Sequence, residues 1–517
     1  MRKAICLFFA IMAMTACSSQ DEFVENVLVN DGQHAFREVS DMEVEMESVP
    51  IELSSPGAGF DFDDPPPPEF RNVSVHDPSV FRVGDTFYVI GSHMAMASTT
   101  DFIQWRQISR YVSDENPLLY SIEDFREALD WARTYTFWAG DIQPMPDGRF
   151  FMYYCTCEGS MPLSAMGLAI SDSPTGPFRN QGVFLRSGMH GISEDGTTYN
   201  ANIHPNVIDP HVFFDSNGVF WMVYGSFSGG IFIMEMDPVT GFPLPNQGYG
   251  RHLMGGNHSR IEGPYMLFSP ETGYYYLFVT FGGLGPRDGY NMRVARSRRP
   301  YGPFHDARGN PMSEVRGAPG SLFDDRSIEP YGTKIMGGYW FRREPGEPGR
   351  TTGYLSPGHN SVYFDEETGR YFLIFHTRFT ETHVHQVRVH EMFLTDEGWF
   401  VVSPFRFDGA PQRAFLPGHV PGSWKLINHG QNIYYDPIIS ITVNLNPDGS
   451  ITGPKTGSWS LEGDGKTFNI TVDGVQYRGR LLRSFANDHG LWVMSFTAKS
   501  SEGIALWGAG VALGDVR

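Results

Sequence analysis

The sequence predicts an all-β protein, a five-bladed β-propeller followed by a small antiparallel β-barrel. Aromatic residues at 14%, with 58 glycines and 36 prolines, suit short strands joined by tight turns better than long helices. From residue 72 to residue 410 one pattern recurs, in which a polar segment precedes an aromatic strand, a glycine turn and a second strand. After this stretch the strands become shorter, so a chain of 517 residues is expected to form two domains behind an N-terminal segment.

Five related units support the propeller prediction. Each opens with a polar or aromatic segment and continues into aromatic-rich strands, as in the run from Asp77 to Val89. Repeated hairpins of this kind are typical of blades that pack radially around a channel. We therefore expect the polar residue that opens a first strand to point into the axial cavity. The five units span residues 77–89, 138–154, 209–224, 262–278 and 359–376.

Residues 411–517 are predicted to form the barrel. Asp-Gly pairs that begin at Asp448, Asp464 and Asp473 separate short runs with strand character. Such pairs are typical of tight turns between antiparallel strands. The runs span residues 439–446, 458–462, 468–472, 476–482 and 491–498.

The first 17 residues predict an export signal that ends at a lipid attachment site. Two basic residues precede an apolar run over residues 4–14, much shorter than the roughly 20 residues that span a bilayer. The small residues before Cys17 are typical of a bacterial lipoprotein processing site, so we expect Cys17 to anchor the exported chain to the outer membrane. The stretch from Ser18 to Glu22 resembles an export tag of surface lipoproteins. The alternative is an ordinary secretory signal in which Cys17 is incidental.

Residues 18–71 are predicted to be a flexible, acidic and proline-rich tether. They show little hydrophobic periodicity, and Asp63 and Asp64 are followed by four consecutive prolines. Such a proline run is a stiff, extended spacer. We expect it to lift the catalytic domain off the membrane.

The charge and the cysteines exclude some classes of function. A formal net charge of −20 argues against nucleic acid as a partner, because no basic stripe is available to neutralise phosphates. It is compatible with a neutral polymer as the substrate. Cys155 and Cys157 lie two apart in a predicted strand, too far along it for easy bridging, so both are expected to be small core residues. We expect a monomer.

Three acids open three of the predicted blades in equivalent contexts. Asp77 and Asp209 directly precede a proline, and Glu262 precedes a Gly-Pro pair. A carboxylate before proline is biased towards extended or turn geometry, and for any one of them a turn-opening cap is the simpler interpretation. Three acids that converge on one cavity suit hydrolysis of a glycosidic bond, which normally uses two carboxyl groups.

With these acids, the chain resembles glycoside hydrolase family 43, and within it the longer endo-α-1,5-L-arabinanases. The resemblance covers residues 75–409, and the C-terminal barrel is similar to the accessory domain of the same enzymes. The motifs that carry it span residues 75–79, 206–210, 224–230, 262–264, 289–294, 356–361 and 375–379.

The resemblance implies a role for each acid. Asp77 would be the general base that activates water, and Glu262 the general acid that protonates the leaving oxygen. Asp209 would hold the acid in place and raise its pKa, since a neighbouring negative charge disfavours ionisation. Such enzymes invert configuration, so base and acid should lie roughly 6.5–9.5 Å apart to leave room for a water. The expected reaction is cleavage of internal α-1,5-L-arabinofuranosyl linkages in arabinan.

The resemblance also implies a metal. His359 would help to hold a hydrated calcium ion in the propeller channel. Calcium prefers oxygen ligands, so a single histidine ligand would need several waters beside it. The alternative is a histidine that hydrogen-bonds to the catalytic acids.

Six further residues are candidates for substrate contact by the same resemblance. Trp138 would form an aromatic wall for a sugar ring, although a tryptophan in a strand-rich protein is more often a core residue. The two arginines could bind sugar hydroxyls or brace Glu262, or could instead be structural ion-pair partners. The full set is Trp138, Asn206, Ser226, Phe227, Arg293 and Arg378.

Two other interpretations remain open. An exo-acting α-L-arabinofuranosidase or β-xylosidase would keep the same carboxylates and differ in the loops that close the groove. A non-catalytic surface lipoprotein that binds glycans is the other alternative, although it would not need all three acids. His383 and His385, with His390 beyond them, could suggest a transition metal, but without a Cys or acidic cluster a surface strand is favoured.

Overall fold

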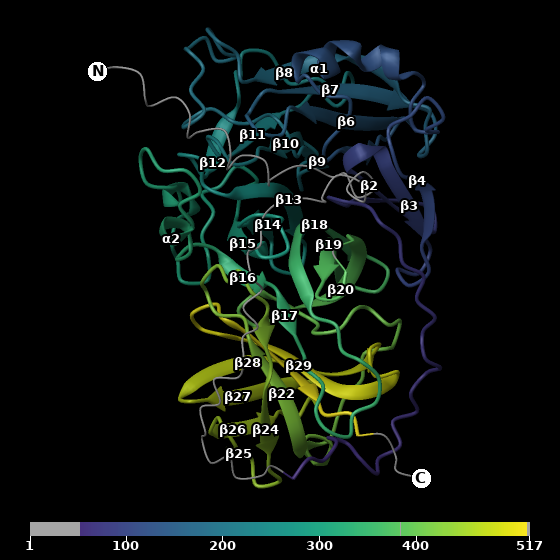
Figure 1. Cartoon of the computed structure of the whole chain (residues 1–517), viewed down its shortest axis with the longest axis vertical. Helices are drawn as coiled ribbons and strands as arrows, with labels where there is room; N and C mark the ends of the chain where they lie inside the picture. The colour runs from purple at the N-terminus through teal and green to yellow at the C-terminus, as the bar shows by residue number, and fades with distance from the viewer. Residues whose placement is uncertain (1–51, 383, 514–517) are drawn as a thin grey trace, which may run out of the picture.

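The computed structural model describes residues 52–382 and 384–513, and it confirms the predicted fold class. Five β-sheets surround one axis, and a closed barrel packs beside blades four and five. The barrel forms one end of the molecule (Figure 1). The innermost strands touch in a closed ring from β1 to β5, β9, β13, β18 and back to β1. The predicted export signal, Cys17 and the tether up to residue 51 lie outside the described residues.

The first four blades are four-stranded antiparallel sheets whose strands follow one another in chain order. Because each strand pairs with the next along the chain, short turns suffice to build a blade. Their strands are β1 (Ser79–Val83), β2 (Thr86–Gly91), β3 (Ala95–Thr99), β4 (Arg106–Ser109), β5 (Asp141–Pro144), β6 (Phe150–Cys157), β7 (Ser164–Ser171), β8 (Arg179–Ser187), β9 (His211–Phe214), β10 (Phe220–Tyr224), β11 (Ile231–Glu235), β12 (Arg251–Met254), β13 (Ile261–Ser269), β14 (Tyr274–Phe281), β15 (Asn291–Ser297) and β16 (Thr333–Met336).

The fifth blade has six strands and includes one that the chain supplies from within the barrel segment. β23 pairs in parallel with β17, through Tyr339 opposite Ile438. It lies in sequence between two barrel strands, so it joins the domains through backbone hydrogen bonds. The strands of this blade are β17 (Tyr339–Trp340), β18 (Tyr354–Asp365), β19 (Arg370–Phe379), β20 (Gln386–Leu394), β21 (Phe400–Val402) and β23 (Ile438–Ile439).

The barrel has eight antiparallel strands and is closed by the pairing of its first strand with its last. The five runs predicted from the sequence correspond to β24, β26, β27, β28 and β29, whereas β22, β25 and β30 were not predicted. The barrel strands are β22 (Gly422–Asn428), β24 (Ile441–Leu445), β25 (Ser450–Thr452), β26 (Gly457–Leu461), β27 (Thr467–Val472), β28 (Val475–Ala486), β29 (Leu491–Ser500) and β30 (Ala505–Gly510).

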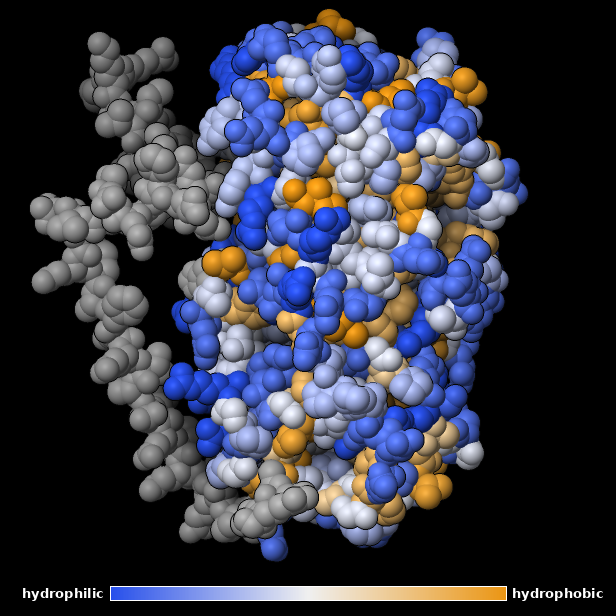
Figure 2. Space-filling model, turned by 90° about the vertical axis from the view of Figure 1, so that its right-hand side faces the viewer, coloured by the Kyte–Doolittle hydropathy of each residue, from blue (hydrophilic) through white to orange (hydrophobic). Residues whose placement is uncertain are grey.

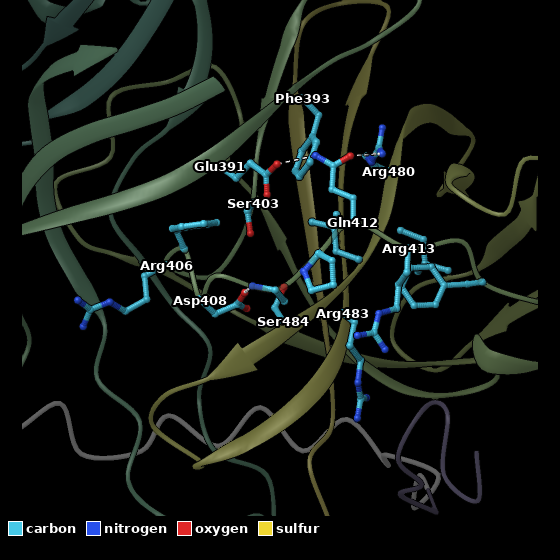
Figure 3. A pocket seen from close by; sticks show the side chains of 16 residues that line it. Glu391, Phe393, Ser403, Arg406, Asp408, Gln412, Arg413, Arg480, Arg483 and Ser484 are labelled. Atoms are coloured by element: carbon cyan, nitrogen blue, oxygen red, sulfur yellow. Dashed lines mark hydrogen bonds between the residues drawn. The ribbon is translucent and has the colours of Figure 1, made fainter. Parts of the chain in front are cut away.

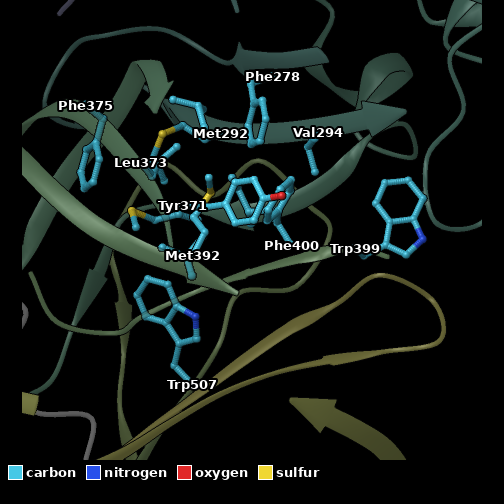
Figure 4. Packing of buried hydrophobic residues seen from close by; sticks show 14 of the residues in the cluster. Phe278, Met292, Val294, Tyr371, Leu373, Phe375, Met392, Trp399, Phe400 and Trp507 are labelled. Carbon is cyan, nitrogen blue, oxygen red and sulfur yellow. The ribbon is translucent and has the colours of Figure 1, made fainter. Parts of the chain in front are cut away.

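One hydrophobic cluster joins the last two blades to the barrel (Figure 4). Trp507 of β30 is fully buried, and its ring lies edge-on to Tyr339 of β17 at 5.0 Å between centroids. Tyr371 and Phe400 from blade five pack in the same cluster. A shared core of aromatic side chains stabilises the position of the barrel because separating the domains would expose all of this surface to water.

The predicted tether is wrong for residues 54–65, which bind the barrel. Ser54 exchanges backbone and side-chain hydrogen bonds with Ser423 of β22. Asp64 forms an ion pair with Arg483 at 2.6 Å, and the carbonyl of Pro65 accepts a hydrogen bond from the Trp492 indole. Charge and proline content alone did not reveal these partners, because they lie more than 350 residues further along the chain.

Helices are few and short in the described part of the chain. They include α1 (Arg126–Trp131) and α2 (Asp325–Ile328), and Asp324 caps the latter by accepting from the Ser327 amide. Among the described residues, no helix has the length and hydrophobicity to cross a membrane. The face in Figure 2 is mostly hydrophilic, with hydrophobic residues scattered between polar ones.

A buried ion pair at the domain junction gives the first prediction. Lys425 of β22 lies 2.7 Å from Glu347, with side chains 1% and 0% exposed. Glu347→Gln would leave a buried ammonium without its carboxylate, so we expect the free energy of unfolding to fall by about 3–5 kcal/mol in urea titrations. The exposed pair of Lys455 with Asp473 is the matched control, and Asp473→Asn should cost no more than about 1 kcal/mol. Equal losses in the two variants would contradict a stabilising role at the junction.

Candidate active site

Three acids and one histidine from four blades lie together at the propeller axis. Asp77 and Asp209 each stand two residues before an innermost strand, β1 and β9 respectively. Glu262 is the second residue of β13, and His359 lies within β18. These four innermost strands belong to the closed ring, which brings together residues that are far apart in the sequence.

His359 connects the acids. Its Nδ1 lies 3.1 Å from Oδ1 of Asp77. Its ring packs so closely on Gly263 that a Cβ there would come within 3.0 Å of the His359 Cγ. Gly263 follows Glu262, and its amide donates to Oδ2 of Asp209 at 3.1 Å. The structure therefore brings the three acids to one site.

Asp77 is a buried carboxylate held on both oxygens. Oδ2 accepts a hydrogen bond from the Ser92 hydroxyl and lies 2.9 Å from Nδ1 of His76, while Oδ1 faces His359. Its amide donates to Nδ1 of His376 at 3.0 Å. Burial alone would raise the pKa of Asp77, but the charges and hydrogen bonds of His76 and His359 hold it well below its ordinary value. Asp77 is therefore ionised at neutral pH.

Glu262 lies between two hydroxyl donors. The Ser226 hydroxyl donates to Oε2 at 2.8 Å, and the Tyr290 phenol donates to Oε1 at 2.7 Å. Burial raises the pKa of Glu262, although His359 and the two hydroxyls act against this rise. The Asp77 carboxylate adds to it because a nearby negative charge disfavours ionisation.

Asp209 and His359 complete the electrostatic pattern. Burial raises the pKa of Asp209 to about 8; His359 opposes this, while Glu262 and Asp77 add to it. Burial alone would lower the pKa of His359, but the carboxylates around it raise it to about 10. The site thus holds one strongly ionised acid and a coupled pair, Asp209 and Glu262, that binds a proton readily. Carboxyl groups with different proton affinities are what acid–base catalysis requires.

The backbone is strained at three of these positions. Asp77, Asp209 and His359 have φ angles of +56°, +57° and +44°, in the left-handed region that non-glycine residues rarely adopt. Of the extended or turn geometry expected before Pro78 and Pro210, the extended alternative is therefore excluded. Each strained residue costs about 1–3 kcal/mol and persists only where its surroundings fix it. Here the hydrogen bonds and ion pairs of the site fix it.

A glycine makes room for the tyrosine that binds Glu262. At Gly358 a Cβ would lie 2.2 Å from Cδ1 of Tyr290. Any larger residue would push the Tyr290 ring away, and with it the phenol that donates to Glu262. Gly358 immediately precedes His359, so one short segment positions both a hydrogen-bond donor of the acid and the histidine.

Comparison with known proteins identifies the family. Residues 70–326 match the family described as glycosyl hydrolases family 43, and residues 404–508 match a C-terminal lipocalin-like domain. The extracellular endo-α-(1→5)-L-arabinanase 2 of Bacillus subtilis is 51% identical over 444 residues, which are 86% of this chain and 94% of that protein. This chain belongs to glycoside hydrolase family 43.

Further relatives cover both domains. The extracellular endo-α-(1→5)-L-arabinanase of Thermotoga petrophila is 44% identical over 85% of this chain and 94% of its own length. The crystal structure of a family 43 glycoside hydrolase from Bacillus licheniformis superposes with a TM-score of 0.83 at 50% identity, covering 86% of this chain and 99% of that one. The predicted resemblance to two-domain members of family 43 is confirmed.

The residues expected to contact the substrate in this family 43 chain are half-buried or buried in the propeller. Trp138 is half-buried, and its indole N–H donates to the carbonyl of Cys157 at 3.1 Å. Asn206 is 8% exposed, and its amide oxygen accepts from the Ser164 hydroxyl. Phe227 is half-buried. Contact of these three with a sugar stays a prediction, whereas Ser226 has a defined partner in Glu262.

The two arginines lie in different surroundings. Arg293 is fully buried and donates to Asn291 and to the backbone carbonyls of Glu329, Tyr331 and Gln431. Arg293 is therefore a structural residue, as the alternative proposed, although its partners are backbone carbonyls and not an acidic side chain. The expectation that it binds sugar or braces Glu262 is wrong. Arg378 is half-buried on β19. Burial is the main cause that lowers the pKa of His376, and the charge of Arg378 adds to it.

A cavity of about 40 Å³ lies at the junction of the propeller and the barrel, away from the site (Figure 3). Its walls come from blade five and from β28, and a hydrogen-bond chain runs from Glu391 through Gln412 to Arg480. A second cavity of about 250 Å³ lies between the same two domains. None of the three axial acids lines either one, so these cavities belong to the domain junction.

Sequence reasoning assigned no role to Tyr290, His76 or His376, and it misplaced His385. Tyr290 and His376 stand within the motifs that carried the family resemblance, yet only arginines of those motifs were singled out. The favoured surface strand is wrong for His385, which is 9% exposed and precedes β20; His383 lies outside the described residues. The sequence does show one histidine, His76, beside Asp77 and another, His376, in a predicted strand of the same domain. Only the fold shows that these two side chains lie together.

Proposed function

We propose that this chain is an exported endo-acting hydrolase that cleaves internal α-1,5-L-arabinofuranosyl linkages of arabinan with inversion. Two relatives at 51% and 44% identity carry the name of extracellular endo-arabinanases. One structural observation carries the proposal, the meeting of ionised Asp77 with the proton-binding pair Asp209 and Glu262 around His359.

In this mechanism Asp77 is the general base. Its pKa is far below neutral, so it is ionised and can accept a proton when a water attacks the anomeric carbon. His76, His359 and Ser92 fix the carboxylate on both oxygens and limit its rotation. An inverting reaction needs the base and the acid roughly 6.5–9.5 Å apart, with the water on the face opposite the leaving group.

Glu262 is the general acid. Its raised pKa keeps a proton available, and this proton passes to the glycosidic oxygen as the bond to the anomeric carbon breaks. The phenol of Tyr290 and the hydroxyl of Ser226 then donate to the carboxylate that forms. Donors that are already in place stabilise this developing charge without reorganisation. Asp209 and Glu262 form a coupled pair, so an ionised Asp209 favours the protonated state of Glu262 before the reaction.

Endo action is favoured over exo action by similarity. A relative named as an extracellular exo-α-(1→5)-L-arabinofuranosidase, from Cellvibrio japonicus, is only 26% identical over 64% of this chain. Two relatives named as endo-arabinanases are 51% and 44% identical over 86% and 85% of the chain. A purely glycan-binding role would not explain why three acids with different proton affinities surround one histidine.

The location follows from the N-terminal sequence and the relatives. Two relatives are named extracellular, which supports export. Attachment to the outer membrane through a lipid on Cys17, with the enzyme facing the cell surface, is part of the proposal. Incorporation of labelled palmitate into wild type but not into Cys17→Ala is the measurement that decides it.

The proposal includes a hydrated calcium ion at His359. A cation fits this place because Asp77, Asp209 and Glu262, whose charges act on His359, can balance its positive charge. To bind the ion, His359 would give up its second proton, because only the neutral ring is a ligand. The Nδ1 of His359 faces Asp77, which leaves Nε2 to face a metal, as in sites where a carboxylate orients a histidine ligand. The bound ion would supply fixed positive charge to the site. His359 would be the protein ligand, and water would fill the remaining positions.

Removal of either catalytic carboxyl group tests the reaction. Asp77→Asn and Glu262→Gln should each lower kcat on linear arabinan at least 10²–10⁴-fold, the typical contribution of acid–base catalysis. Chromatography should show mixed oligosaccharides from the wild type. Asp147→Asn, in an exposed turn of blade two, is the control and should keep full activity. Undiminished hydrolysis by either buried variant would refute the assigned roles.

The pH profile tests Glu262 as the acid. An acid catalyst is active when protonated, so activity falls as the pH rises through its pKa. Tyr290→Phe removes a hydrogen bond that stabilises the carboxylate, so the pKa should rise and the alkaline limb should move upward by about 0.5–1 pH unit. Ser226→Ala should act in the same direction. A downward move of this limb in both variants would mean that Glu262 works in its ionised form.

Chelation tests the metal. Calorimetric titration of EGTA-treated wild type with calcium should show one ion per chain, and activity should return with occupancy. His359→Gln should lose both the binding signal and the response to calcium. His258→Gln, at a half-buried histidine on a loop, is the control and should behave like the wild type. An EGTA-treated enzyme that binds no calcium would remove calcium from the proposal.

A further inference from the structure

Three histidines cluster beside Asp77. His76 directly precedes Asp77, His376 lies on β19, and His385 precedes β20. One ring nitrogen from each lies within 4.8 Å of the other two. Within residues 52–382 and 384–513, no other set of three or more His, Cys, Asp or Glu side chains is grouped in this way. His359 does not belong to this group of three, although its Nδ1 and that of His376 both lie near Oδ1 of Asp77.

The free ring nitrogens of this cluster are buried. The Nε2 atoms of His76, His376 and His385 have no hydrogen-bond partner among the described residues. His376 is 0% exposed and His385 9%. Buried polar atoms are nearly always satisfied, so three unsatisfied nitrogens in one place indicate a ligand that binds to all of them. His76 remains partly exposed, with 16% of its side chain accessible, which leaves a route for a small ion.

We propose that His76, His376 and His385 bind a divalent transition metal ion such as Zn²⁺. Three imidazoles with a water in the fourth position are a donor set that zinc adopts, and imidazole also suits copper, nickel and cobalt. The 2.9 Å contact of His76 Nδ1 with Asp77 is the carboxylate–histidine arrangement that leaves the Nε2 lone pair for a metal. Burial keeps the pKa of His376 and His385 well below the usual range, so both rings are neutral, as ligands must be.

Metal binding requires His376 to change its hydrogen bonding. Its Nδ1 accepts the amide N–H of Asp77, so without metal the ring carries its proton on Nε2. Coordination through Nε2 moves this proton to Nδ1 and breaks the bond to the amide. Oδ1 of Asp77 lies 3.5 Å from this Nδ1 and can accept the proton's new hydrogen bond. Arg378, whose charge acts on both buried rings, also opposes a cation, whereas the Asp77 carboxylate favours it.

The geometry couples this metal to the reaction. A metal on Nε2 of His76 makes its Nδ1–H a stronger donor to Asp77, and the shifted proton of His376 adds a second donor. Both donors draw electron density from the Asp77 carboxylate and make it a weaker base. Because this carboxylate accepts the proton of the attacking water, zinc should slow hydrolysis. This coupling rests on the proposed function, whereas the metal site itself does not.

Zinc titration of the full chain tests the site. Protein stripped with EDTA and then saturated with calcium should bind one zinc per chain by calorimetry, and cobalt should give the visible absorption of a tetrahedral site. His385→Gln should weaken zinc binding by more than about 100-fold, beyond the 10–100-fold typical of losing an outer-shell partner. His190→Ala, an exposed histidine outside the cluster, is the matched control and should bind as the wild type does. Circular dichroism checks that His385→Gln is folded.

The outcomes separate the site from the function. Wild type without stoichiometric zinc, or His385→Gln with unchanged affinity, would overturn the metal site and leave a bound water as the ligand of the three rings. Zinc binding that follows His385 in a protein inactive on arabinan would support the site and refute the proposed function. Full arabinan hydrolysis at saturating zinc would overturn the coupling to Asp77.

Discussion

The contact between the Asp77 carboxylate and the imidazoles around it is the interaction on which the site depends. A buried charge costs several kcal/mol unless it is paired and hydrogen-bonded. His76, His359 and Ser92 provide these partners. Because His359 also acts on Asp209 and Glu262, one cation links the three acids and separates their proton affinities. Asp77 acts as the base and Glu262 as the acid because their hydrogen-bonding and charged partners differ.

The closed propeller is the means by which this contact is made. Four blades supply the acids and His359, and three of these residues adopt strained left-handed conformations that only a rigid frame maintains. Blade five carries His359, and the barrel holds this blade through the parallel strand β23 and through Trp507. The barrel therefore contributes to the site by fixing one blade. The described hydrogen bonds to the three acids come from propeller residues.

The sequence predicted the elements that repeat and missed those that depend on distant partners. The acids that open three blades and the five barrel runs with clear turns were predictable, because each signal is local. Arg293 could not be assigned, since its partners are backbone carbonyls that carry no sequence signature. His385 was taken for a surface residue because its cluster with His76 forms only when blade five closes on blade one. Residues 54–65 were misjudged for the same reason.

The location of the protons is the most direct test of this account. A neutron structure of the deuterium-exchanged protein at neutral pD would show each carboxyl group as protonated or bare. The account predicts a bare Asp77 carboxylate and one deuteron on the pair formed by Asp209 and Glu262. A deuteron on Asp77, with Asp209 and Glu262 both bare, would contradict it.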